Sequence, residues 1–201
     1  MPELVAEGEE FYRRRGVLPR FLVSTASAPP SLSPYLLEQR YVSDAPTFVA
    51  RATTADVIEN TSDNGWGAQV AERPNDAWFG YWSVESTRGR GADDAHICRQ
   101  FLLSPPWPCV YVAIKEDEHV EAVGQVVVEG GWAGVQCMAT APVYRQRGGA
   151  SAVLHRLAVE ASAMGARRMY LAVMAVNTRA RGLYERSGFE VAHEYRYFSL
   201  E

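Results

Sequence analysis

The chain is poor in cysteine, since its 201 residues contain only Cys98, Cys109 and Cys137, and no two of them are in Cys-x-x-Cys spacing. This pattern favours neither a disulfide framework nor a zinc site. No apolar run approaches the ~20 residues that a membrane helix needs. The acidic N-terminal residues also lack the apolar core of a signal peptide. The sequence therefore predicts a reduced, cytoplasmic protein with no membrane partner.

An excess of positive charge is also missing, because the formal net charge is −4 and the sequence pI is about 5.6. Such a balance argues against a general nucleic-acid binder. The four histidines show no ligand spacing, so no metal is expected. The stretch from Arg145 to Arg186 is nevertheless rich in arginine. A basic patch on an acidic protein suits a small anionic ligand.

From residue 67 onward, hydrophobic periodicity predicts a single α/β domain. The segment 168–176 is apolar on both faces, which is typical of a strand buried within a sheet. Trp78 and Trp82 are one helical turn apart, and this spacing favours core packing over a role in a binding cleft. The predicted elements, in order, are strand 67–72, helices 75–86 and 92–103, strands 108–115, 122–128 and 133–140, a helix ending at Gly165, strand 168–176, a helix ending at Gly188, and strand 189–200.

The first 66 residues predict a helix, a strand, a helix and a strand (4–15, 20–24, 31–40 and 47–52), which is the order of the last quarter of the chain. We therefore hypothesise that residues 1–66 are a degenerate partial copy of the fold whose complete copy spans residues 67–201. An unrelated N-terminal extension is the alternative. Loss of the first strands of such a copy leaves a sheet edge to cover, which makes a homodimer possible.

A glycine turn with the sequence Arg145-Gln146-Arg147-Gly148-Gly149-Ala150 opens a long amphipathic helix directly after a hydrophobic strand. Small residues let the backbone approach an anion closely, and the first helical turn adds N–H donors and the positive end of the macrodipole. The two arginines can pair with phosphate oxygens. The segment therefore predicts a site for the pyrophosphate of a nucleotide-like cofactor.

Three stretches together resemble the GNAT (GCN5-related N-acetyltransferase) superfamily. The glycine turn is similar to the family's acetyl-CoA signature, Gln/Arg-x-x-Gly-x-Gly/Ala. The preceding Met138-Ala139-Thr140-Ala141-Pro142-Val143-Tyr144-Arg145 resembles the family's approach strand. The third stretch, Asn177-Thr178-Arg179-Ala180-Arg181-Gly182-Leu183-Tyr184-Glu185-Arg186-Ser187-Gly188-Phe189, resembles Asn-x-x-Ala-x-x-Leu-Tyr-x-x-x-Gly-Phe.

The resemblance implies a central mixed, splayed sheet flanked by helices, with the pantetheine arm of CoA between strands 133–140 and 168–176. It also implies that Tyr184 is a general acid for the departing thiolate and that Asn177 contacts CoA besides capping its helix. The implied cofactor-binding residues are Met138, Ala139 and Thr140 for pantetheine, and Arg145, Gln146, Arg147, Gly148, Gly149 and Ala150 for pyrophosphate.

A general base is not evident, because the strand before the glycine turn carries no carboxylate. Glu72 and Glu129 are candidates, although each is more typical of a solvated surface residue. An acyl-cysteine route through Cys137 is disfavoured because a lone strand thiol is usually inert packing. Direct attack on the thioester, aided by water and by a backbone oxyanion donor at Met138 or Ala139, is favoured instead.

The expected function is acetyl transfer from acetyl-CoA to a primary amine of a small molecule or of a peptide or protein. A non-catalytic acyl-CoA-binding regulatory module is the alternative from another class. Transfer to a hydroxyl acceptor is a third, less favoured possibility.

Overall fold

The computed structural model describes residues 1–26, 29–86, 92–103, 105–116 and 119–200. It divides into two compact units. The first consists of residues 1–50, 172–181 and 191–201, and the second of residues 51–171 and 182–190. Within the described ranges, no helix is long and apolar enough to cross a membrane.

The first unit contains the helix-strand-helix-strand series that the sequence predicts near the N-terminus. Its strand β1 pairs antiparallel with β8, and β8 lies between β1 and β2. The buried residues Val5, Leu36 and Phe198 form its core together with Val23 and Tyr41. The elements are α1 (Pro2–Arg13), β1 (Arg20–Ser24), α2 (Leu32–Glu38), β2 (Val42–Thr53) and, from the C-terminus, β8 (Glu190–Ser199). The descent of residues 1–66 from a copy of the fold stays a prediction.

The second unit is built on a mixed sheet with the strand order β7-β6-β5-β4-β3. The pair β6 and β7 is parallel, and the other neighbours are antiparallel. This arrangement confirms the predicted α/β class and element order. The elements are α3 (Thr54–Glu59), β3 (Ala68–Ala71), α4 (Asp76–Ser86), α5 (Ala92–Leu103), β4 (Cys109–Glu116), β5 (His119–Glu129), β6 (Trp132–Thr140), the 3-10 turn η1 (Pro142–Tyr144), α6 (Gly149–Ala163), β7 (Arg168–Met174) and α7 (Thr178–Arg186).

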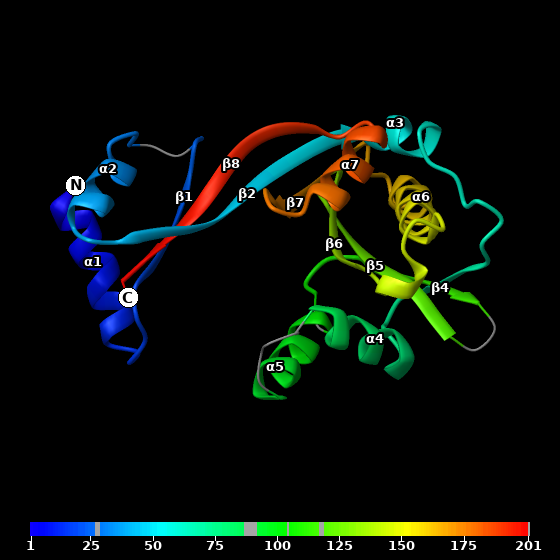
Figure 1. Cartoon of the computed structure of the whole chain (residues 1–201), viewed down its shortest axis with the longest axis horizontal. Helices are drawn as coiled ribbons and strands as arrows, with labels where there is room; N and C mark the ends of the chain where they lie inside the picture. The colour runs from blue at the N-terminus through cyan, green and yellow to red at the C-terminus, as the bar shows by residue number, and fades with distance from the viewer. Residues whose placement is uncertain (27–28, 87–91, 104, 117–118, 201) are drawn as a thin grey trace. The chain divides into compact units, whose positions relative to one another are not determined.

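Helices α6 and α4 lie on opposite sides of strands β4 to β6 (Figure 1). The fully buried Val153, Leu154 and Leu157 on α6 follow helical spacing. Gly124 on β5 lies directly under this helix, since a Cβ there would be 2.7 Å from Val153 and 2.9 Å from Leu157. Side chains alternate along a strand, so Val123 and Gln125 face α4 instead, where they contact the cluster around Trp78 and Tyr111.

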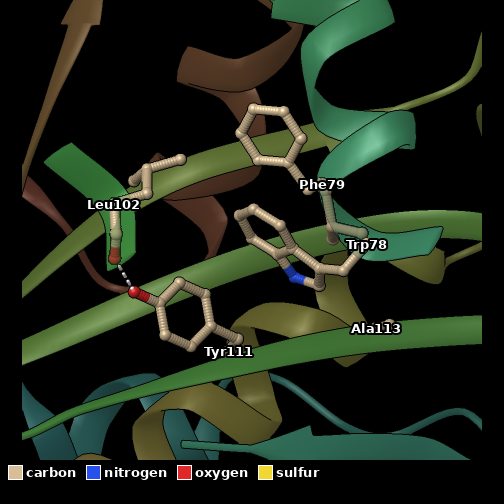
Figure 2. Packing of buried hydrophobic residues seen from close by; sticks show 6 residues of the cluster. Trp78, Phe79, Leu102, Tyr111 and Ala113 are labelled. Atoms are coloured by element: carbon tan, nitrogen blue, oxygen red, sulfur yellow. Dashed lines mark hydrogen bonds between the residues drawn. The ribbon is translucent and has the colours of Figure 1, made fainter. Parts of the chain in front are cut away.

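The α4 side of the sheet carries an aromatic core (Figure 2). Trp78 is buried, and its indole N–H donates to the Val112 carbonyl at 2.9 Å. Its ring stands edge-on to that of Tyr111, with 5.2 Å between centroids. The Tyr111 hydroxyl donates to the Leu102 carbonyl, as Figure 2 shows. Core packing is thus confirmed as the role of Trp78, and the stacked ring of Trp82 extends the same cluster.

Helix α3 is absent from the elements that periodicity predicts. It is only six residues long, too short for a recognisable apolar stripe. The Thr53 hydroxyl caps it by accepting from the Asp56 N–H at 3.1 Å. The Thr54 hydroxyl donates to the Ala166 carbonyl at 3.0 Å, which ties the helix to the turn before β7. Helix α3 therefore packs beside α6 and fixes the start of the loop that follows it.

The prediction that strand 168–176 is buried on both faces is wrong. Its residues alternate strictly between exposed and buried, and Tyr170 and Met174 are 44% and 48% exposed. At the exposed position Tyr170, the apolar ring serves to pack along the surface of the sheet. Its ring packs edge-on against Trp132, with 6.3 Å between centroids, and covers Gly134 of the neighbouring strand.

We expect Gly124→Ala to lower the free energy of unfolding by about 2 kcal/mol, because the new methyl group would overlap Met138, Val153 and Leu157 together. Gly80→Ala, in the exposed interior of α4 with nothing within 4 Å of the new methyl group, is the control. It should raise the stability by about 0.5–1 kcal/mol through helix propensity. Urea denaturation measures both variants, and equal stabilities would contradict the packing described for Gly124.

Candidate active site

Strand β6 contains a bulge at the position where the sheet opens. Val123 pairs with Ala139, whereas Gln125 pairs with Gln136, so β6 holds one extra residue between these pairs. Cys137 within this stretch has a φ of +55°, a left-handed conformation that is uncommon for a residue with a side chain. The bulge re-aims the backbone of Met138 and Ala139 next to the sheet opening.

The pairing of β6 with β7 ends early. It runs from Trp132 opposite Arg168 to Gly134 opposite Tyr170, while β6 itself continues to Thr140. On its other side, β6 stays paired with β5 as far as Thr140 opposite Ala122. The backbone of Met138, Ala139 and Thr140 thus has no strand partner on one side within the described residues, and an extended ligand could add there like a strand. The Thr140 carbonyl already accepts one hydrogen bond, from Arg145. The sheet is splayed, as the sequence resemblance implies.

The glycine turn follows this open strand edge after one 3-10 turn. Gln146 and Gly148 have φ values of +65° and +88°, so left-handed positions alternate with Arg147 between them. Such alternation turns successive N–H groups toward one concave side, a common anion-binding arrangement. The first intrahelical bond of α6 runs from the Ala152 N–H to the Gly148 carbonyl. The N–H groups of Gly149, Ala150 and Ser151 therefore lie at the positive end of a 15-residue helix.

The two arginines of the turn are held differently. The Arg145 Nε donates to the Thr140 carbonyl at 3.2 Å and so closes the turn against the end of β6. The Arg147 guanidinium lies 5.5 Å from the centroid of the Trp66 ring and 5.6 Å from that of Tyr144. Its Nη1 donates to Glu121 at 3.4 Å.

Glu121 is a functional candidate that the sequence reasoning missed. It is 1% exposed, whereas Glu72 and Glu129 are exposed as the sequence predicted. The available signal was a lone carboxylate within a strand whose other inward positions are apolar or amide-bearing. A buried carboxylate requires a cation or several donors, because desolvation penalises its charge. Arg147 supplies the cation, so the charge of the glycine turn is partly balanced from β5.

Tyr81 on α4 connects the first part of β5 with the residue that follows the end of β6. Its hydroxyl donates to the Glu121 carbonyl at 2.5 Å and accepts from the Ala141 N–H. The Ala141 N–H also reaches the Glu121 carbonyl at 3.3 Å. This junction fixes where β6 leaves the sheet and the turn begins.

Tyr184 lies in the last turns of α7 and is buried, with 8% of its surface exposed. The helix ends in a Schellman motif, in which the Phe189 N–H bonds to the Tyr184 carbonyl and Gly188 has a φ of +91°. The Tyr184 and Phe189 rings pack edge-on at 5.9 Å. Burial raises the pKa of the Tyr184 phenol to about 12, so this phenol stays protonated at neutral pH.

Asn177 belongs to the first unit, unlike the other predicted site residues. Its side-chain oxygen accepts from the Ala180 N–H at 3.2 Å, which confirms the predicted helix cap. Its contact with CoA stays a prediction.

The α4 side of the bulge is lined by the aromatic core, against which Cys137 and Ala139 pack. The Cys137 thiol lies 3.7 Å from the Gln125 side-chain oxygen, and the Gln125 Nε2 donates to the Tyr111 hydroxyl at 2.9 Å. The half-buried Cys137 is thus joined to the buried polar pair of Gln125 and Tyr111. Within the described part of the chain, no group of three His, Cys, Asp or Glu side chains is placed to hold a metal ion.

An open strand edge that leads into an anion-binding turn is the geometry of an acyl-CoA-dependent acyltransferase. The family model described as "Acetyltransferase (GNAT) family" matches residues 69–189. The chain belongs to this family, whose members use acyl-CoA and acetylate amine acceptors.

Individual relatives agree with this assignment. The chain is 28% identical to the uncharacterized N-acetyltransferase YobR of Bacillus subtilis, over 98% of this chain and 80% of that protein. Among solved structures, a GCN5-related N-acetyltransferase from Sphaerobacter thermophilus has a TM-score of 0.73 at 20% identity, covering 98% of this chain and 66% of its own. A tandem GNAT protein from the clavulanic acid biosynthesis pathway has a TM-score of 0.70 at 13% identity, covering 100% of this chain and 69% of its own. The two structures show that the fold is shared.

We expect Arg147→Met to lower the free energy of unfolding by about 1–2 kcal/mol, because the buried Glu121 carboxylate loses this cation. The effect is smaller than for a fully buried pair, since the Arg147 side chain is 41% exposed and solvent screens it. Arg168→Met is the matched control, because its guanidinium also lies over a tryptophan ring, 5.3 Å from the Trp132 centroid. Equal losses in urea denaturation would show that ring packing, and not the carboxylate, carries the effect.

Proposed function

We propose that the protein transfers the acetyl group of acetyl-CoA to a primary amine of a small molecule or of a peptide or protein, by direct attack in a ternary complex. One observation carries the proposal: the unpaired side of β6 continues into a turn with two left-handed residues and the N-terminus of α6. CoA has the same order of groups, because its extended pantetheine arm carries amides that can pair with a strand edge and ends at a diphosphate that can bind the turn.

The backbone of Met138, Ala139 and Thr140 would pair with the pantetheine amides. The segment from Arg145 to Ala150 would hold the diphosphate, with charge from its arginines and with N–H donors from Arg147 to Ala150. Asn177 would add a contact to the CoA arm. We expect the reaction to proceed without a metal ion.

In the chemical step, the acceptor nitrogen loses a proton to water and attacks the thioester carbonyl carbon. The carbonyl oxygen gains negative charge, which a backbone N–H at Met138 or Ala139 would stabilise next to the bulge. Collapse of the tetrahedral intermediate breaks the C–S bond, forms the amide and releases CoA as a thiolate. No carboxylate of β6 is needed, because water carries the proton away.

Tyr184 would act on the leaving sulfur. Its phenol has a pKa of about 12, whereas an ordinary thiol has a pKa of about 8.5. The phenol therefore holds its proton more tightly than a thiol does. A hydrogen bond from the phenol to the developing thiolate therefore contributes more to the rate than complete transfer of the proton. General-acid donation by Tyr184 begins only as negative charge builds up on the sulfur.

The N-terminal segment 1–66 would be a partial GNAT copy without a cofactor site of its own. Its helix-strand-helix-strand order supports this, and so does the likeness of the whole chain to a tandem GNAT protein. A homodimer is a further part of this proposal, because β1 lies at the end of its sheet.

Calorimetric titration with acetyl-CoA tests the proposal. The wild type should bind with a micromolar Kd, and Gly148→Asp should abolish binding because it places a carboxylate in the anion site. Gly165→Asp is the matched control, because Gly148 and Gly165 share a φ of +88° and so the same backbone strain. Gly165 follows the opposite end of α6, so its variant should bind normally.

Failure of the wild type to bind acetyl-CoA would end the proposal. Binding without turnover of any amine would favour the non-catalytic regulatory module, and turnover of alcohols alone would favour a hydroxyl acceptor.

We expect Tyr184→Phe to lower kcat by about 10- to 100-fold, the value of a hydrogen bond to a charged group. The Kd of acetyl-CoA should change little, because the thiolate exists only late in the reaction. With a pKa of about 12, the phenol should not produce an alkaline decline in rate below about pH 10. Tyr195→Phe, on β8, serves as the control. Unchanged kcat in Tyr184→Phe would remove this residue from the mechanism.

A further inference from the structure

Residues 61–66, part of the loop between α3 and β3, lie against the glycine turn. This segment, loop 61–66, precedes the residues 69–189 that the family model matches. All of these residues belong to the second unit. The loop touches the turn and α6 through three side chains, those of Thr61, Asn64 and Trp66.

Thr61 anchors the start of the loop on α6. It is 9% exposed, and its hydroxyl lies 3.1 Å from the His155 Nδ1. The same hydroxyl donates to the Val57 carbonyl at 2.5 Å, within α3. Because α3 itself packs on α6, loop 61–66 begins at a fixed point beside the glycine turn.

Trp66 contacts Arg147 twice. Its indole N–H donates to the Arg147 carbonyl at 3.4 Å, and its ring faces the guanidinium at 5.5 Å. One contact restrains the backbone of the turn and the other restrains the side chain. An arginine that is already restrained loses less conformational entropy when it binds an anion.

Asn64 lies next to Gly148 of the glycine turn. It has a left-handed φ of +52°, and its side-chain oxygen accepts from the Ser62 hydroxyl at 2.7 Å. The Nδ2 donates to the Ser62 carbonyl at 3.3 Å and lies 3.0 Å from where a Cβ of Gly148 would be. An amide nitrogen has two hydrogens, so the second is available on the side of the turn.

We propose that loop 61–66 forms the outer wall of the diphosphate site, with Trp66 as the positioning residue for Arg147 and Asn64 as a further amide donor to the diphosphate. This inference rests on the proposed use of acetyl-CoA. Glu121 also restrains Arg147, but its removal would change the local charge as well as the geometry. Trp66 is uncharged, so its substitution isolates positioning.

Calorimetric titration of Trp66→Leu with acetyl-CoA tests the inference. The Kd should rise about fivefold, because a cation–π contact and one weak hydrogen bond are lost. Trp66→Phe keeps a ring over the guanidinium and should recover most of the affinity. Trp132→Leu, which removes the ring under Arg168, is the matched control and should leave the Kd unchanged. Asn64→Ala should raise the Kd about threefold through loss of one donor.

A double-mutant cycle separates positioning from a merely structural role. In the Arg147→Met background, Trp66→Leu should change the Kd less than twofold, because only the weak hydrogen bond to the backbone carbonyl of residue 147 remains to be lost. An unchanged Kd in Trp66→Leu alone, or an equal loss in both backgrounds, would overturn the inference. Failure of the wild type to bind acetyl-CoA would instead overturn the proposed function.

Discussion

The site depends on the release of β6 from β7. A strand normally satisfies the backbone groups on both of its sides, and exposing them costs free energy unless water or a ligand pairs with them. In this protein the bulge at Cys137 and the end of pairing at Gly134 free one side of β6, while β5 keeps the other side in register. Gly124 of β5, opposite this bulge, packs directly beneath α6. The free strand edge is therefore a property of the sheet's backbone pairing, and the surrounding side chains modify only the charge and shape beside it.

Charge at the mouth of this opening is balanced rather than maximal. The glycine turn presents arginines and helix N–H groups, which all favour an anion. Glu121 places a buried carboxylate against the inner side of Arg147, and the rings of Trp66 and Tyr144 lie against its guanidinium. A guanidinium has five N–H donors in a rigid fork, so one can hold Glu121 while others face a ligand. The arrangement restrains the arginine at the cost of some positive potential.

Much of the second unit is predictable because its sequence is locally consistent. The helix predicted at 92–103 has these bounds in the structure, and strands β4, β5 and β6 lie where alternating apolar residues indicate them. The glycine turn and α6 follow from adjacent residues in the same way. Helix α3 was missed because its stability comes from the Thr53 cap and from Thr54 contacting the turn before β7, not from an apolar stripe. For β7, the apolar composition wrongly indicated burial on both faces, because the half-exposed Tyr170 packs only edge-on against Trp132 of the neighbouring strand.

The sequence by itself determined the local chemistry: the order of strand, glycine turn and helix, the small residues of the turn, and the tyrosine and glycine at the end of α7. These features arise among residues within a few positions of one another, so short-range geometry decides them. Only the tertiary structure decided which distant side chains complete the site. Trp66 meets Arg147 across 81 residues and Glu121 meets it across 26. Such meetings depend on sheet register and on the packing of α3 against α6, and no local pattern encodes them.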